Sequence, residues 1–192
     1  MFNEEMSVSP YNLITLLADI HNLKETPVIN YESRTFIVLE SFMNQAFSSK
    51  SFNFYSTFLF QLVLGCRISE LLNSKLHISQ RLITIEIFCS KQKLSRTVSF
   101  NPVIFTRDLY RWLPNSYNHF FNEKEFNRRF YKYVWSATNF MNCNMNSKSH
   151  LLRHLNVCIL YDILKLDKSY IKKYFKWESI DTVDTYLKLL YI

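Results

Sequence analysis

The sequence predicts a mainly α-helical domain that carries one small antiparallel β-sheet in the form of a hairpin. Apolar residues recur at helical spacing through most of the 192 residues. One segment, residues 81–100, changes to an alternation close to every second residue, which is typical of a strand. The chain is 48% hydrophobic and 20% charged, which excludes a disordered tail and allows one buried core.

The first elements follow from caps and breaks. Residues 1–27 read as a lead segment, in which Ser9 and Pro10 begin a helix over residues 11–21. Helical periodicity continues over residues 33–47 and 52–64. Gly65 breaks the second of these, and a further helix is expected to begin near Ile68.

The hairpin and the later helices complete the predicted fold. Two alternating runs enclose the polar turn 90–95, which carries Lys91 and Lys93 and makes a basic hairpin tip. A loop is expected over residues 142–149, where Ser147 or Ser149 would cap the helix that follows. The remaining helices are expected over residues 103–112, 123–141, 150–165, 168–175 and 180–190.

The composition excludes several classes of site. A single glycine cannot supply a Walker loop, a dinucleotide-binding fingerprint or a G-x-S-x-G nucleophile elbow, each of which needs more than one. The histidines and cysteines lack metal-ligand spacing and the acids are scattered, so no metal and no cofactor is expected. The cysteines are expected to be reduced and buried. They are Cys66, Cys89, Cys143 and Cys158.

Localisation and partners follow from hydropathy and charge. No apolar run reaches the roughly 18–20 residues that span a bilayer. Glu4 and Glu5 stand where a signal peptide would carry positive charge, so a cytoplasmic protein is expected. The 23 basic against 16 acidic residues favour a polyanionic partner, with nucleic acid first. Many basic domains bind no nucleic acid, so charge alone leaves both readings open.

Two local patterns place basic side chains at turns. In the segment 65–72, Arg67 opens a helix directly after a glycine turn, and Glu70 stands one turn later, where it can orient the arginine. Lys91 sits on the hairpin tip, from which a lysine can reach a phosphate and deliver a proton. The alternative for segment 65–72 is the start of an ordinary amphipathic helix. The alternative for Lys91 is a surface lysine without a functional role.

Two further patterns lie near the C-terminal end. His150, Arg153 and His154 share one helix face, with the intervening leucines toward the core, and this makes a phosphate clamp beside a proton-transfer group. Trp177 and Tyr186 stand nine residues apart across a turn and the next helix. The alternatives are a structural histidine with a surface arginine, and two core aromatic residues.

Together, the order and spacing of these patterns resemble the catalytic domain of the tyrosine recombinase (phage integrase) family, over roughly residues 28–192. That family carries an arginine in G-x-R-x-S-E-L, a lysine on a β-hairpin, H-x-x-R-H on a helix, and His or Trp nine residues before a nucleophilic tyrosine. In this sequence the corresponding positions are Arg67, Lys91, His150, Arg153, Trp177 and Tyr186. The final segment also resembles the family pattern L-G-H-x-S-I-x-T-T-x-x-Y, with Ser179, Ile180 and Thr182 in register.

The chain departs from the family pattern at three points. Trp177 replaces the commoner histidine, and its indole N–H can still donate to a phosphate oxygen. Lys176 replaces the glycine that usually precedes it. Only residues 1–27 precede the catalytic region, whereas family members usually carry an N-terminal DNA-binding domain of about one hundred residues.

The resemblance implies a site-specific DNA recombinase or integrase that works without metal. Tyr186 would attack a phosphodiester and form a covalent 3′-phosphotyrosine, while two arginines stabilise the phosphorane and Lys91 protonates the leaving 5′-oxygen. The implied partners are double-stranded DNA, further copies of the chain on DNA, and a partner that supplies site recognition.

Two rival readings and one rival nucleophile stay open at this point. The rival functions are a non-catalytic or accessory DNA-binding protein with a reduced recombinase fold, and a helical interaction module without a DNA role. Tyr186 is preferred to Tyr191 as the nucleophile because of its register with Trp177. The short C-terminal tail is expected to allow Tyr186 to dock away from the site when DNA is absent.

Overall fold

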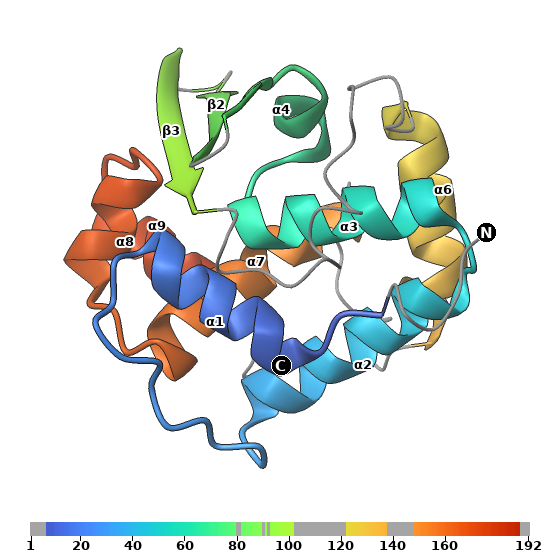
Figure 1. The fold of residues 1–192 in the computed structure, drawn as a ribbon, viewed down its shortest axis with the longest axis horizontal. Helices are drawn as coiled ribbons and strands as arrows, with labels where there is room; N and C mark the ends of the chain where they lie inside the picture. Colours follow the sequence, from blue (N-terminus) through green and yellow to red (C-terminus); the bar gives the residue numbers. More distant parts are fainter. Residues whose placement is uncertain are drawn as a thin grey trace.

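The computed structural model describes residues 7–79, 82–89, 91, 93–101, 122–137 and 148–188. These residues form a mostly helical fold with one small antiparallel sheet, as the sequence predicts (Figure 1). The α-helices are α1 (Pro10–Ile20), α2 (Arg34–Ser48), α3 (Phe52–Leu64), α4 (Ile68–Leu72), α6 (Glu123–Tyr133), α7 (Leu151–Cys158), α8 (Lys168–Tyr174) and α9 (Ile180–Leu187). The strands are β1 (Lys75–Ile78), β2 (Ile83–Cys89) and β3 (Leu94–Phe100).

The first three helices begin and end within one residue of their predicted positions. The side chain of Ser9 accepts a hydrogen bond from the Asn12 amide, and Ser33 does the same for the Phe36 amide at the start of α2. Helix α3 ends at Gly65, which adopts the left-handed conformation with φ 58°. Caps and breakers are local signals, which explains why the sequence alone placed these boundaries.

Helix α3 is the centre of the core. It crosses the middle of the molecule in Figure 1, with α1 and α2 on one side and the sheet and α4 on the other. Its residues from Phe54 to Leu64 are all buried, and α7 packs along it. Leu13 and Leu17 of α1 are fully buried in the same core cluster, so the lead segment packs against the rest of the described chain.

The predicted hairpin is formed by β2 and β3, which pair antiparallel with Ile85 opposite Val98. A third strand, β1, which the sequence did not predict, pairs antiparallel with the other edge of β2, so the one small sheet has three strands. Strand β1 has only four residues, too few for an alternation to be recognised in the sequence. The inward face of the sheet carries apolar side chains and one arginine, Arg96.

The helix expected over residues 123–141 is shorter than predicted. Helix α6 ends at Tyr133, and a 3₁₀ turn, Trp135–Ala137, follows it. The hydroxyl of Ser136 donates to the carbonyl of Lys132. Such a side-chain bond competes with the helical backbone bonds, and this accounts for the early end. The helix expected over 103–112 lies outside the described residues.

The helix expected over residues 150–165 is divided into three parts. A 3₁₀ turn, Lys148–His150, leads into α7, which continues as a π-helix over Ile159–Ile163. The residue that caps α7 is His150, whose side chain makes no capping hydrogen bond. The prediction of Ser149 as the cap was therefore wrong, and Ser147 lies outside the described residues. Helices α8 and α9 follow close to their predicted starts.

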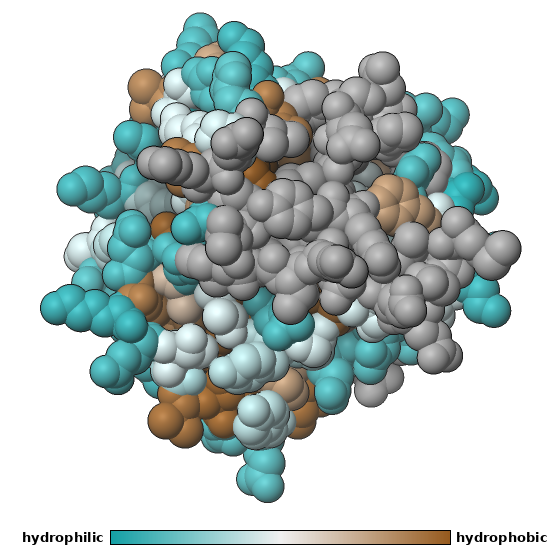
Figure 2. All heavy atoms as spheres, viewed as in Figure 1, coloured by the Kyte–Doolittle hydropathy of each residue, from teal (hydrophilic) through white to brown (hydrophobic). Residues whose placement is uncertain are grey.

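In Figure 2, hydrophilic side chains gather along the left edge, over α8, and apolar patches lie between hydrophilic ones elsewhere on this face. Within the described ranges, no helix is both long and apolar enough to cross a membrane. Cys66, Cys89 and Cys158 are free and buried, as predicted, while Cys143 lies outside these ranges.

Candidate functional site

The site is built on the turn at Gly65. A Cβ atom at this position would lie 2.6 Å from Oδ1 of Asn156 and 2.8 Å from Cζ of Phe175, so only glycine fits. Its left-handed backbone is also one that glycine adopts without strain. The turn ends α3 and starts α4, and it sets Arg67 at the N-cap position of α4.

Two arginines that are far apart in the sequence meet on one buried carboxylate. Oε2 of Glu70 accepts a hydrogen bond from the backbone amide of Arg67 at 2.9 Å and a second from Nη2 of Arg153. Nη1 of Arg67 lies 3.5 Å from Oε1 of the same carboxylate. Glu70 therefore orients both guanidinium groups, whereas the sequence suggested this role only toward Arg67.

Arg153 is buried, which corrects the alternative that made it a surface arginine. It is 3% exposed, and its Nε donates to the carbonyl of Gly65 at 2.7 Å. Helix α7 is covered by α3 on one side and α9 on another, so even its polar face lies inside the molecule. Helical periodicity correctly put Arg153 with His150 on one face, but periodicity does not reveal what covers that face.

Tyr186 on α9 lies against His150. Its hydroxyl is 3.1 Å from Nε2 of His150, and its ring stacks on Trp177 with a centroid distance of 4.7 Å and an angle of 5°. Tyr186 is 8% exposed. The expectation that Tyr186 docks away from the site without DNA does not describe this structure, in which the same chain supplies all three side chains.

His154 belongs to the same group, although the sequence did not assign it a role beyond sharing a helix face. Its Nδ1 lies 3.2 Å from the backbone carbonyl of Tyr186, and its ring is tilted against the Tyr186 ring at 4.4 Å. Because a carbonyl only accepts, Nδ1 carries the proton in this contact. The available signal was the spacing of His150 and His154, which places their rings edge to face, one helical turn apart.

Burial keeps both histidines neutral at pH 7. Desolvation, followed by the positive charge of Arg153, lowers the pKa of His150 to about 3. Desolvation likewise lowers the pKa of His154 to about 4, against a smaller opposing effect of its bond to the Tyr186 carbonyl. A neutral imidazole has one unprotonated nitrogen, so His150 is able to accept the hydroxyl proton of Tyr186 at Nε2.

A small open cavity lies in front of these groups. Its volume is about 200 Å³, below the roughly 300–1,000 Å³ of sites for drug-sized ligands, so it suits one small group. It is lined by Arg67, Lys91, Trp177, Glu178, Thr182 and Tyr186. Four of the six predicted site residues therefore share one cavity. Of the other two, His150 contacts Tyr186 of that lining, and Arg153 is linked to Arg67 of the lining through Glu70.

The hairpin tip carries Lys91 and Lys93, and the turn between α8 and α9 carries Lys176. Lys91 is exposed and lines the cavity, whereas Lys93 adopts a left-handed backbone with φ 53° and is not part of the lining. Lys176, which stands where the recombinase pattern has glycine, also adopts a left-handed backbone, with φ 58°. The backbone shape that favours glycine is thus present at Lys176 without the glycine.

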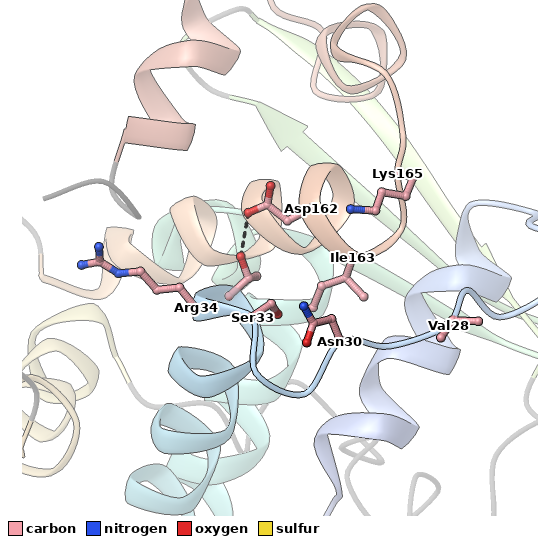
Figure 3. Close-up of a pocket in the computed structure, with 8 residues that line it drawn as sticks. Val28, Asn30, Ser33, Arg34, Asp162, Ile163 and Lys165 are labelled. Carbon is pink, nitrogen blue, oxygen red and sulfur yellow. Dashed lines mark hydrogen bonds between the residues drawn. The ribbon is translucent and has the colours of Figure 1, made fainter.

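A second cavity, of about 420 Å³, lies beside the N-terminal end of α2 (Figure 3). Thr35 donates a hydrogen bond of 2.7 Å to Asp162, and the guanidinium of Arg34 extends away from the other labelled side chains. Its described lining holds no histidine, cysteine or tyrosine, and none of the predicted site residues. The lining consists of Val28, Asn30, Ser33, Arg34, Thr35, Asp162, Ile163 and Lys165.

Among the residues whose structure is described, no three histidine, cysteine, aspartate or glutamate side chains come together as metal ligands. Comparisons of the chain with models of protein families, with curated proteins and with solved structures found no match.

Proposed function

We propose that this protein is a DNA strand transferase of the tyrosine recombinase type, with Tyr186 as its nucleophile. The observation that carries the proposal is the contact of the Tyr186 hydroxyl with Nε2 of His150, 3.1 Å, at a cavity that Arg67 and Lys91 also line. A nucleophile beside a neutral base and two cationic side chains is the arrangement that phosphodiester cleavage needs. The resemblance of the sequence patterns supports the same assignment.

The first half of the reaction uses the base and the arginines. The Tyr186 oxygen forms a bond to phosphorus while its proton passes to Nε2 of His150. Arg67 and Arg153 stand on either side of Glu70 and stabilise the negative charge that gathers on the non-bridging oxygens.

The second half releases the 5′ end of the cut strand. The bond from phosphorus to the 5′-oxygen breaks, and Lys91 delivers a proton to that oxygen from the exposed hairpin tip. The product is a 3′-phosphotyrosine at Tyr186 and a free 5′-hydroxyl. A second 5′-hydroxyl then gives its proton to Lys91 and attacks the phosphotyrosine; the bond from phosphorus to the Tyr186 oxygen breaks, and that oxygen regains its proton from His150. A phosphodiester is restored, so no nucleotide cofactor is needed. The partners are double-stranded DNA and further copies of the chain on it.

One observation favours the rival function of a non-catalytic DNA-binding relative. The guanidinium of Arg153 is buried and donates to both Glu70 and the Gly65 carbonyl, which is what a purely structural arginine would do. In that case the chain, with its excess of basic residues, would bind DNA, and the Tyr186 hydroxyl would remain unmodified.

A covalent-trapping experiment decides between the two. The protein is incubated with nicked duplexes, from which the cleaved 5′-hydroxyl fragment diffuses away, and the products are run on a denaturing gel. Our proposal requires a protein–DNA adduct whose linkage maps to the peptide that contains Tyr186. DNA binding that weakens steeply with salt, together with no adduct on any duplex, would establish the accessory function instead.

A further inference from the structure

Arg96 is a buried cation at a position where the strand pattern calls for an apolar side chain. It is 4% exposed and points to the inward face of the sheet, opposite Ile87 and two residues before Val98. Its Nη2 donates to the carbonyl of Leu64, and the Tyr174 hydroxyl interacts with the guanidinium, while Nε and Nη1 meet no hydrogen-bond acceptor at ordinary distance and angle among the described residues. It belongs to none of the sequence motifs described above.

The charge of Arg96 has no counter-charge among the described residues. Its guanidinium carbon lies 4.7 Å from the ring centre of Tyr174 and 5.0 Å from that of Phe175, and no carboxylate contacts it. Burial, and then the charge of Arg96, lower the pKa of His21 to about 4, so this neighbour is neutral as well. An unpaired buried charge is unfavourable for folding, and its presence calls for an explanation.

Arg96 lies beside Arg153. The two side chains donate to the adjacent carbonyls of Leu64 and Gly65, and both guanidinium groups lie against the ring of Phe175, at 5.0 Å and 5.8 Å. Burial raises the pKa of the Cys66 thiol, which follows Gly65 in sequence, and the charges of Arg96, Arg153 and Glu70 have smaller effects on it.

The cluster as a whole carries a surplus of positive charge. Among the described residues it contains the guanidinium groups of Arg67, Arg96 and Arg153 and one carboxylate, that of Glu70, for a net charge of +2. A phosphodiester carries one negative charge, and the phosphorane formed when a phenolate attacks it carries two. Two of the three arginines, Arg96 and Arg153, are buried, and the surplus of two positive charges complements the two negative charges of the phosphorane.

We propose that Arg96 is a positioning residue of the phosphate site. Its uncompensated buried charge raises the affinity of the site for anions, and its hydrogen bond to the Leu64 carbonyl holds the adjacent Gly65 turn in place. This inference rests on the proposed function and deepens it, because it assigns a third arginine to the site that binds the scissile phosphate. Arg96 does not line the cavity, and it acts through Arg153 and Phe175.

The test compares Arg96→Met with Arg128→Met by sulfate binding. Both changes remove one positive charge, but Arg128 is an exposed residue of α6, paired with Glu125. Thermal unfolding is followed at low millimolar sodium sulfate and at sodium chloride of equal ionic strength. We expect Arg96→Met to bind sulfate on the order of tenfold more weakly than the wild type, with equal or higher stability in chloride. Arg128→Met should bind sulfate like the wild type.

Each remaining outcome bears on the inference. A folded Arg96→Met variant with the sulfate affinity of the wild type would overturn it and leave the proposed function standing, provided that the wild type forms the DNA adduct. If Arg96→Met does not fold, Arg96→Lys replaces it. That variant keeps the charge, so it should retain sulfate binding, and loss of binding in folded Arg96→Lys would also overturn the inference. A wild type that neither binds sulfate nor forms the adduct would remove the proposed function itself.

Discussion

Trp177 and Tyr186 stack face to face, with ring centroids 4.7 Å apart and an angle of 5° between the ring planes. The indole stacks in turn on Phe175 at 4.6 Å, and the phenol ring contacts His154 on its other side. This aromatic column fixes the ring of Tyr186 in the site through its faces. The hydroxyl, at the edge of the ring, remains available to His150 and to the cavity.

The column predicts that the Tyr186 hydroxyl is dispensable for folding and essential for chemistry. Tyr186→Phe keeps the stacked ring and removes one oxygen, so DNA binding and stability should remain close to those of the wild type while the covalent adduct disappears. Adduct formation on nicked duplexes is measured by denaturing gel. Tyr191→Phe is the matched control and should leave the adduct intact; Tyr191 itself lies outside the described residues. An adduct that survives Tyr186→Phe would show that another residue is the nucleophile.

Lys91 is predicted to be the acid for the leaving group. Lys91→Ala should slow strand cleavage on the order of 10²–10⁴-fold, because the 5′-oxygen then departs without a proton. A duplex with a sulfur atom at the bridging 5′ position should restore the rate, since sulfur leaves without protonation. Lys93→Ala, at the same tip but not among the residues that line the cavity, serves as the control. Rescue of Lys93→Ala and an unaffected Lys91→Ala would reverse the assignment.

Glu70 is predicted to be required for folding because it neutralises two arginines. Glu70→Gln leaves the guanidinium groups of Arg67 and Arg153 together without a negative charge, and we expect a loss of about 3 kcal/mol or more in the free energy of unfolding. Urea titration measures this loss. Glu125→Gln, which also breaks contacts to two arginines but at the surface of α6, should have little effect. Equal losses in the free energy of unfolding for the two variants would mean that the buried carboxylate contributes no more to stability than an exposed one.

Gly65 is predicted to tolerate no side chain. Gly65→Ala places a Cβ atom against Asn156 and Phe175 and puts alanine in the left-handed conformation. The combined strain and overpacking should lower the free energy of unfolding by about 2–4 kcal/mol. Denaturant unfolding of the variant checks the value. A stability equal to that of the wild type would show that the turn can relax around a Cβ atom.

The buried histidines predict that stability falls as the pH falls. Burial lowers the pKa of His21, His150 and His154 to about 4, 3 and 4, whereas in the unfolded chain these groups titrate near the ordinary value of about 6.5. Between about pH 4 and 6.5 the unfolded chain therefore binds more protons, and each histidine contributes a slope of at most about 1.4 kcal/mol per pH unit. The stability that neutral imidazoles contribute is complete above this window and is lost below it.

Urea unfolding at several values between pH 5 and 7 measures that slope. His21→Gln and His154→Gln should each flatten it, because glutamine does not titrate. His77→Gln changes an exposed histidine of β1 and should leave the slope as it is in the wild type. A slope that none of the buried-histidine variants alters would mean that these side chains are hydrated in the folded protein.

The site residues divide between those that local spacing predicted and those that it did not. Arg67, Lys91, Trp177 and Tyr186 come to one cavity, and each was singled out from a short motif. Arg96 was not: the alternation puts it on the same face as Val98 and Phe100, but an arginine is usually exposed, so its type argued against a buried position. His154 had the right helix face, but its contact with the Tyr186 carbonyl joins two helices that the sequence cannot orient.

The sequence by itself determined the helical class, the bounds of α1, α2 and α3, and the hairpin, because caps, periodicity and the Gly65 break act within a few residues. Only the tertiary structure decided that β1 joins the sheet, that Arg153 and Arg96 are buried, and that Glu70 serves two arginines. Burial and shared hydrogen bonds depend on which elements pack together. A long-range contact such as that of Glu70 with Arg153 cannot be recognised from the spacing of residues in either segment.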